Sequence, residues 1–342
     1  MTGVRVRAPG KVMLFGEYAV LEGATARVAA VETWAGVAAH APADAATYRI
    51  HGEVVDSPGP FVEAALATVD ALRDAVWDLD SRAFSIECAD GGRTKLGLGS
   101  SAAITVAAVG AARALAGLSA RPQDVLGPAL VAHRVAQGGR GSGADVAASA
   151  LGGVVDCAFF AQAAWGPPDA LPVGEASLAV SARSVGRALP HLTLVFSGAS
   201  ASTPALIQAV MSQRHARPVI WDRALCALAD ASDAGAAALD ADSRLELAQA
   251  VRQGDRAMAA LSRELGGGTA LLGPLHAQLT ALMGPTCALK TTGAGGGDLY
   301  WLYGDTEAAE AEAAARVEAA GHLVLRLGLE PRGFVVEAPG AE

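Results

Sequence analysis

The chain has 342 residues, of which 52% are hydrophobic and 18% charged, so it is long and apolar enough to bury a substantial core. Its formal net charge of −9 argues against a general binder of nucleic acid or of anionic membranes. The most apolar stretch, residues 102–118, is interrupted by Arg113 and is too short for a membrane span, and the N-terminal residues show no hydrophobic signal core.

The first half of the chain is predicted to begin with strands and to continue with helices. Val4 and Val6 alternate with arginines, which favours strands within the first 55 residues. A helix is expected from Pro60, with an apolar face that reaches Val76. Further elements are predicted as a strand over 84–88 and helices over 101–115, 122–137 and 146–150.

The second half is predicted to form a separate lobe. Residues 162–190 contain Pro and Gly without a sustained period, so we place the boundary there and expect lobes over 1–185 and 186–342. The order of elements is typical of a sheet backed by helices on one side. The expected elements are strands over 192–196, 286–289, 299–303, 322–328 and 333–337, helices over 203–216, 221–239 and 243–265, and a helix that Asp305 caps and Gly321 ends.

The basic residues give the first indication of chemistry. Of 26, only Lys11, Lys95 and Lys290 are lysine, and each lies in or beside a Gly-rich segment. A compact ammonium can contact one phosphate oxygen from a confined angle, which a planar guanidinium cannot do as well. Chance placement is the alternative interpretation.

The segment Lys95-Leu96-Gly97-Leu98-Gly99-Ser100-Ser101-Ala102-Ala103 lies between a predicted strand and a predicted helix. Its glycines and the helix N-terminus would form an anion site, and its two hydroxyls could bind phosphate or Mg²⁺. A dinucleotide fingerprint is the first alternative, but no acidic residue follows about 20 positions later. A plain turn with a serine cap is the second. A Walker A loop is excluded because no Gly-Lys-Ser/Thr follows the glycines.

Two further Gly-rich segments are candidates for ligand contact. Residues 291–298 (TTGAGGGD) join two apolar strands, and they are either a tight hairpin or a loop packed against a ligand or against the first Gly-rich loop. Residues 138–145 (GGRGSGAD) end in Asp145, which is either the N-cap of a short helix or a carboxylate that orients a nucleophile or takes its proton. The histidine spacing indicates no zinc site, and no GxSxG elbow occurs.

Together the three segments resemble the GHMP kinase superfamily. Residues 8–20 (APGKVMLFGEYAV) are similar to its first motif, Gly97–Ala103 to its phosphate loop and Lys290–Asp298 to its third motif. Within the superfamily the mevalonate-pathway branch fits best. Tyr18 replaces the histidine that is usual in mevalonate kinases, and residues 141–149 and 197–203 look more like phosphomevalonate kinases.

The resemblance implies an α+β fold of two lobes, in which an N-terminal mixed α/β lobe carries the phosphate loop and a C-terminal ferredoxin-like sheet is backed by helices. It implies an ATP-dependent, Mg²⁺-dependent phosphotransferase acting on a small molecule, with 5-phosphomevalonate as the expected acceptor. Catalytic roles are expected for Lys11 and Asp145. ATP would contact Lys95, Gly97, Leu98, Gly99, Ser100, Ser101 and Ala102, with Ser100 or Ser101 on the metal. The acceptor would contact Glu17, Tyr18, Arg140, Ser142, Gly143, Ser202, Thr203, Thr292 and Gly293.

Several alternatives remain open at this point. The acceptor could be an alcohol, as in a mevalonate or sugar kinase, and a catalytically inactive ligand sensor or a decarboxylating relative are other possibilities. Arg214, His215 and Arg217 are either a basic cluster facing the cleft or a solvated helix end. Four dispersed cysteines without a CxxC pair are typical of reduced thiols, so we expect a cytoplasmic protein. The net negative charge predicts no nucleic-acid or membrane partner. The expected assembly is a monomer or a homodimer.

Overall fold

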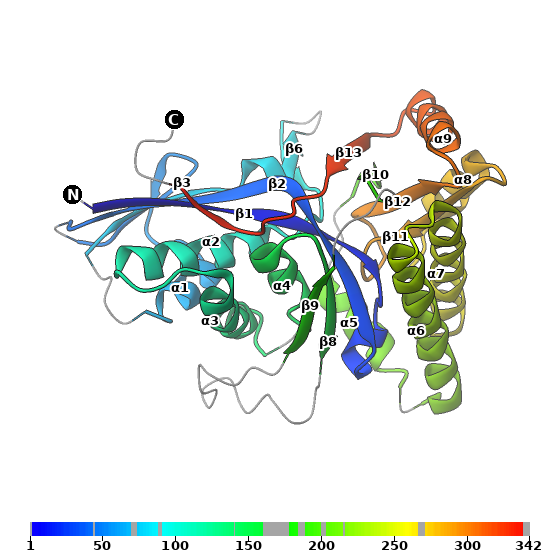
Figure 1. The fold of residues 1–342 in the computed structure, drawn as a ribbon, viewed down its shortest axis with the longest axis horizontal. Helices are drawn as coiled ribbons and strands as arrows, with labels where there is room; N and C mark the ends of the chain where they lie inside the picture. The colour runs from blue at the N-terminus through cyan, green and yellow to red at the C-terminus, as the bar shows by residue number, and fades with distance from the viewer. Residues whose placement is uncertain are drawn as a thin grey trace.

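The computed structural model of the chain describes residues 2–43, 45–69, 74–87, 91–139, 141–159, 178–183, 189–199, 203–214, 216–265 and 271–337. The fold is α+β, as expected, and two groups of elements lie side by side (Figure 1). None of the helices in these ranges is both long and apolar enough to cross a membrane.

The N-terminal group is built on an eight-stranded sheet whose longest members are β1 (Thr2–Phe15) and β2 (Thr25–Ala41). Along the main path the strand order is β14-β1-β2-β5-β3-β4, while β8 pairs with β2 and β9 with β8. Among the strands of the described residues, only β3 and β5 pair in parallel. The other strands are β3 (Thr47–Ile50), β4 (Glu53–Val55), β5 (Val76–Asp80), β8 (Val154–Phe159), β9 (Leu178–Arg183) and β14 (Val335–Glu337).

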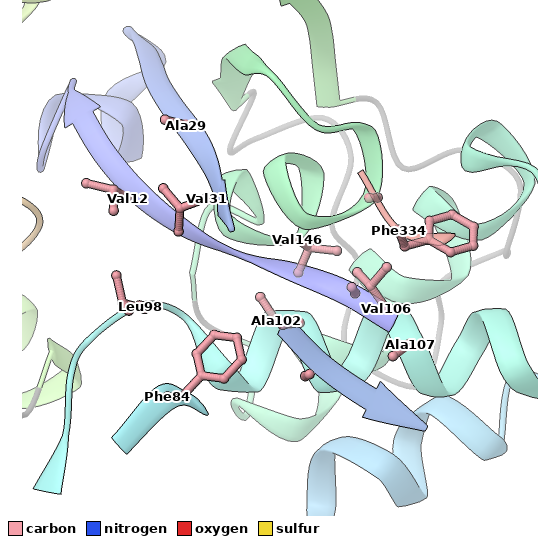
Figure 2. Packing of buried hydrophobic residues seen from close by; sticks show 14 of the residues in the cluster. Val12, Ala29, Val31, Phe84, Leu98, Ala102, Val106, Ala107, Val146 and Phe334 are labelled. Atoms are coloured by element: carbon pink, nitrogen blue, oxygen red, sulfur yellow. The ribbon is translucent and has the colours of Figure 1, made fainter. Parts of the chain in front are cut away.

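Four helices pack in this group, and the central one is the alanine-rich α2 (Ser100–Leu115), which contacts β1 and β2. Small side chains let α2 lie close to the sheet, and Ala102, Val106 and Ala107 are fully buried. Figure 2 shows Leu98 and Phe84 in the same core. The other helices are α1 (Pro60–Leu66), α3 (Pro122–Ala136) and α4 (Ala144–Leu151), and 3₁₀ turns are η1 (Ala19–Glu22) and η2 (Arg82–Phe84). A separate ribbon pairs β6 (Ser85–Glu87) with β7 (Arg93–Lys95).

The C-terminal group holds a four-stranded antiparallel sheet in the order β11-β12-β10-β13. Its strands are β10 (His191–Phe196), β11 (Cys287–Thr291), β12 (Leu299–Gly304) and β13 (Val324–Gly328). Its helices are α5 (Thr203–Met211), α6 (Pro218–Asp240), α7 (Arg244–Leu265), α8 (Pro274–Met283) and α9 (Glu307–Ala319).

Helices cover both faces of this second sheet, whereas the sequence predicted helices on one side. Leu279 of α8 and Val317 of α9 pack with Val195 and Leu302 on one face. Leu247 and Val251 of α7 belong to the cluster that holds Leu194 and Trp301 on the other face. Alternate residues of β10, β11 and β12 therefore face two apolar layers, which explains why these three strands are almost continuously buried.

The end of β1 joins the two groups. The Phe15 ring packs edge-on against Trp301 of β12, with 5.7 Å between ring centroids, and a β-carbon on Gly235 of α6 would collide with that ring. β14 pairs with β1 of the N-terminal sheet, although the sequence placed residues 333–337 in the C-terminal lobe. The division at residue 185 falls outside the described residues and stays a prediction.

Three local predictions need correction. Val76 starts β5 instead of ending the helix that begins at Pro60, since Trp77 and Leu79 alternate into the core. Residues 178–183, which lie within the expected boundary segment, form β9. The cap of α9 is Thr306, whose hydroxyl accepts the Ala309 amide at 3.1 Å, and not Asp305.

Candidate active site

Lys11 lies against the first Gly-rich loop. Its backbone amide donates to the Leu98 carbonyl at 2.8 Å, and a β-carbon on Gly99 would come within 2.7 Å of Lys11 Cγ and 2.8 Å of Lys11 Cε. A β-carbon on Gly10 would likewise meet the Leu98 carbonyl at 2.9 Å. Lys11 and the first Gly-rich loop are therefore neighbours in the fold, and their close approach depends on glycine at positions 10 and 99.

The loop ends at the start of α2, where Gly99, Ser100 and Ser101 are partly exposed. Gly97 and Gly99 have φ values of +78° and +80°, a region that favours glycine. Gly99 is the N-cap of α2 and supplies no side-chain acceptor, so the first amides of this 16-residue helix have no capping side chain. Leu98 and Ala102 are almost fully buried, so the parts of the loop that a ligand can reach are the partly exposed residues, which are Gly97, Gly99, Ser100 and Ser101. Such a donor set suits phosphate oxygens.

The third Gly-rich segment packs on the first. A β-carbon on Gly97 would lie 2.5 Å from Asp298 Cβ and 3.0 Å from its Oδ2, so the Asp298 side chain rests on the Gly97 backbone. The Asp298 amide donates to the Ala199 carbonyl, and the Ser197 amide donates to the Asp298 carbonyl, each at 2.8 Å. Of the two interpretations of this segment, the structure supports the loop packed against the phosphate-loop segment.

Asp145 and Ser101 approach each other through a residue that the sequence analysis missed as a site residue. Nε2 of His133 lies 3.2 Å from Ser101 Oγ and 3.9 Å from Asp145 Oδ2. Asp145 Oδ1 accepts the amide of Val146 at 3.0 Å at the start of α4. His133 falls on the apolar stripe of α3 that contains Val125 and Ala129, and a polar residue at such a position is the signal that could have identified it.

Glu17 and Tyr18 were expected to contact the acceptor, and the structure corrects this expectation. Both are buried, and Glu17 pairs with the Nζ atom of the fully buried Lys290. Burial raises the pKa of the Glu17 carboxyl even though the Lys290 ammonium acts in the opposite direction. The Tyr18 hydroxyl donates to the Ala294 carbonyl at 2.7 Å. These side chains therefore connect the end of β1 to β11 and to the third Gly-rich segment instead of facing a ligand.

Lys290 was a candidate for phosphate contact because it lies beside a Gly-rich segment. In the structure its side chain is fully buried instead. Its Nζ donates to the Thr291 carbonyl at 2.7 Å and lies 5.6 Å from the centre of the Phe15 ring. The retained ammonium here serves a buried ion pair. Lys95, by contrast, is exposed at the end of β7, in the same segment as the phosphate loop.

The remaining residues expected around the acceptor are distributed over three segments. Ser142 and Gly143 precede α4, and the Ser142 hydroxyl accepts the Ala144 amide at 3.4 Å. The Thr292 hydroxyl donates to the Leu299 carbonyl at 3.1 Å. A β-carbon on Gly293 would have no heavy atom within 4 Å, so the space beside this residue is open. Thr203 begins α5. Arg140 and Ser202 lie outside the described residues.

The basic cluster after α5 is largely explained by local contacts. Arg214 forms a salt bridge with Glu22 at 2.8 Å, and Arg217 donates to the Glu264 carbonyl at 2.9 Å. His215 lies outside the described residues. The interpretation as a surface helix end is the one that these contacts favour.

The donor set fits Mg²⁺ held jointly with phosphate. Across the described ranges no group of three or more His, Cys, Asp and Glu side chains forms a metal cluster. Mg²⁺ does not require such a cluster, because it is commonly bound by one or two protein oxygens together with substrate phosphates and water. The hydroxyls of Ser100 and Ser101 and the carboxylate of Asp145 offer such oxygens beside the start of α2.

Comparisons with known proteins relate part of the sequence and the whole fold to characterised enzymes. Residues 62–153, which include the phosphate loop and Asp145, match the family described as GHMP kinases N terminal domain. This match supports the resemblance of the chain to the GHMP kinase superfamily. It is 26% identical to a mevalonate kinase of Pyrococcus horikoshii over 360 aligned positions, covering 98% of each chain.

Solved structures of the superfamily share the fold over nearly the whole chain. The structure of the Streptococcus pneumoniae phosphomevalonate kinase with phosphomevalonate and AMPPNP matches with a TM-score of 0.78 and 21% identity, covering 96% of this chain and 100% of that one. The L. major mevalonate kinase with R-mevalonate matches with a TM-score of 0.68 and 18% identity, covering 97% of each. The two-lobed fold expected from the sequence is thereby confirmed.

Proposed function

We propose that this chain transfers the γ-phosphoryl group of ATP to the phosphate of 5-phosphomevalonate, which yields 5-diphosphomevalonate and ADP. The observation that carries the proposal is the packing of Lys11 against Leu98 and Gly99, directly beside the uncapped amides of α2. An ammonium beside the start of α2 would suit a phosphate group bound there. The match of residues 62–153 to the N-terminal domain of GHMP kinases supports phosphoryl transfer as the reaction class.

Phosphoryl transfer depends mainly on positioning and on stabilisation of charge. The amides around Gly97–Ser101 would hold the phosphates of ATP, because no side chain caps the start of α2 and the helix dipole there favours an anion. The Lys11 ammonium would lie between the transferred group and the acceptor oxygen. The bond from the γ-phosphorus to the bridging oxygen of ADP breaks while a bond to a phosphate oxygen of the acceptor forms, and Lys11 offsets the negative charge that two anions bring together.

Ser100 or Ser101, with Asp145, would hold Mg²⁺ against the ATP phosphates. When bound, the cation supplies neutralisation of the negative charge on the phosphate oxygens. Asp145 is partly exposed and already accepts the Val146 amide through Oδ1, which suits an orienting or charge-balancing carboxylate.

A phosphate acceptor is consistent with this role for Asp145. The second pKa of a phosphate monoester is about 6, so the acceptor oxygen is ionised near neutral pH and needs no general base. An alcohol acceptor would need Asp145 to take its proton. The likeness in fold to a phosphomevalonate kinase, with a TM-score of 0.78 compared with 0.68 for a mevalonate kinase, favours the phosphate acceptor.

Mevalonate kinase activity is the second candidate, because two mevalonate kinases are 26% and 27% identical to this chain. ADP release should be measured with ATP and either 5-phosphomevalonate or mevalonate, and with 5-diphosphomevalonate while carbon dioxide is monitored. The proposal predicts fast ADP release only with 5-phosphomevalonate. Fast release with mevalonate alone would assign the second candidate, and carbon dioxide release would indicate a decarboxylase.

A further inference from the structure

Three helices of the N-terminal group meet at one buried imidazole. His133 lies in the last turn of α3 and is only 2% exposed. Its Nε2 faces Ser101 Oγ of the first turn of α2 at 3.2 Å and Asp145 Oδ2 of the first turn of α4 at 3.9 Å. The Phe61 ring lies against the imidazole, with 5.1 Å between centroids. The ring is thus confined on one side while its Nε2 edge points to two residues assigned to the reaction.

The chemistry of the two neighbours determines which form of the imidazole fits. An ionised carboxylate only accepts hydrogen bonds, and a hydroxyl has one donor and two lone pairs. A hydrogen on Nε2 therefore satisfies the Ser101 hydroxyl directly and faces the Asp145 carboxylate with favourable polarity. The distance of 3.9 Å between His133 Nε2 and Asp145 Oδ2 is too long for a hydrogen bond, so this contact is electrostatic.

We propose that His133 is a positioning residue that fixes the Ser101 hydroxyl and sets the place of the Asp145 carboxylate beside the phosphate loop. Donation from Nε2 occupies one lone pair of Ser101 Oγ and leaves the other lone pair and the hydroxyl hydrogen for a ligand. The remaining contacts of the two residues are local, since the Ser101 carbonyl accepts from Thr105 and Asp145 Oδ1 accepts from Val146. His133 is the described side chain that links them.

This inference rests on the proposed function, and it extends to how well Mg²⁺ assists nucleotide binding. A loosened Ser101 hydroxyl would have to be ordered by the cation itself, which weakens Mg²⁺ binding and misplaces the transferred group. The acceptor should bind almost as before, because no acceptor contact changes. A histidine that only fills space between helices would produce no such selective loss.

Two variants of similar size separate these possibilities. His133→Gln keeps an N–H donor near the place of Nε2, and His133→Met has comparable bulk without a donor. We expect His133→Met to lower kcat at least about tenfold and to leave KM for the acceptor within about twofold. His133→Gln should retain more than about a third of the wild-type kcat. Equal losses in both variants would overturn the proposal.

Calorimetry of AMPPNP binding with and without Mg²⁺ gives a readout independent of turnover. We expect Mg²⁺ to improve AMPPNP affinity in the wild type, and His133→Met to lose most of that improvement. The loss in the double variant with Ser101→Ala should be smaller than the sum of the two single losses, since residues that act through one another are not additive. If Mg²⁺ fails to improve AMPPNP binding in the wild type, the proposed function fails. If Mg²⁺ improves AMPPNP affinity equally in the wild type and in His133→Met, only this inference is overturned.

The tautomer of His133 can be tested without any substitution, which covers the case that His133→Met does not fold. Long-range ¹⁵N–¹H spectra of the ligand-free wild type distinguish the two neutral imidazoles, with His133→Gln identifying the resonance. We expect the hydrogen on Nε2. A hydrogen on Nδ1 alone would leave Nε2 as an acceptor beside a carboxylate and would contradict the proposed donation.

Discussion

The aliphatic part of the Lys11 side chain lies along the backbone of Gly99, so closely that a β-carbon at residue 99 would come within 2.7 Å of Lys11 Cγ. Lys11 comes from β1 and Gly99 from the turn that starts α2, 88 positions later in the chain (99 − 11). This one contact therefore explains both the lysine at position 11 and the glycine at position 99. The position of the ammonium depends on the absence of a side chain at residue 99.

Gly99→Ala should therefore lower kcat by more than its effect on the melting temperature explains. The added methyl group would displace Lys11, and we expect kcat to fall at least about tenfold, or about 1.4 kcal/mol of barrier. Gly91→Ala is the matched control, because Gly91 has the same φ of +80° and a β-carbon there would meet no heavy atom within 4 Å. Both variants should lower the melting temperature by similar amounts. Equal kcat values for the two would contradict the assigned role of the contact.

The buried pair of Glu17 and Lys290 predicts a large effect on stability. Lys290→Met leaves the Glu17 carboxyl buried without its cation, which should cost about 3–5 kcal/mol in denaturant unfolding. The double variant Glu17→Leu with Lys290→Met should recover part of this loss, because it removes both charges. A double variant that is less stable than Lys290→Met would show that the charge pair is not the reason.

The same variant has a defined pH dependence. Burial already raises the pKa of Glu17 in the folded protein, and loss of Lys290 removes the attraction that opposes this shift. A carboxyl with a raised folded pKa stabilises the fold most below its ordinary value of 4.5, and this contribution is lost as pH rises through the raised value. The deficit of Lys290→Met relative to wild type should therefore be larger at pH 8 than at pH 5 in urea titrations.

Gly293→Ala tests whether the third Gly-rich segment faces a ligand. Space around this residue is open, and its φ lies outside the left-handed region, so the substitution should change the free energy of unfolding by less than about 1 kcal/mol. If the segment lines the acceptor site, KM for the acceptor should rise severalfold while the protein stays equally stable. An unchanged KM would place the segment outside the site.

Thiol labelling tests the arrangement of the cysteines. Cys226 is exposed, whereas Cys157 is buried and burial raises the pKa of its thiol, so little thiolate is present there. In the native protein Cys226→Ser should remove one reactive equivalent, and Cys157→Ser should remove none. Labelling of Cys157 before unfolding would contradict the packing of β8 against β2.

Local signals in the sequence identified much of this fold and part of the site. The small residues of α2 and the prolines that start α1 and α3 made these helices predictable, and the glycines of three segments identified the phosphate-binding loop and its packing partner. Val76 was misassigned because a short apolar run satisfies both helical and strand periods until tertiary pairing selects one.

Long-range pairs were beyond prediction from local pattern. Glu17 and Lys290 are 273 positions apart, and neither position alone indicates that the two charges neutralise each other in the core. His133 presented no metal spacing, and its contact with Ser101 and Asp145 depends on how three helices pack. Sequence reasoning found the residues that carry chemistry more readily than those that hold them in place.

The most direct test is the turnover number of Lys11→Met with ATP, Mg²⁺ and 5-phosphomevalonate. The variant keeps the length of the side chain along Gly99 and removes only the ammonium. We expect kcat to fall at least about a hundredfold, or about 2.7 kcal/mol, with KM for ATP within about threefold, because the charge acts on the transferred group. A decrease of less than about tenfold would show that Lys11 does not stabilise the transfer.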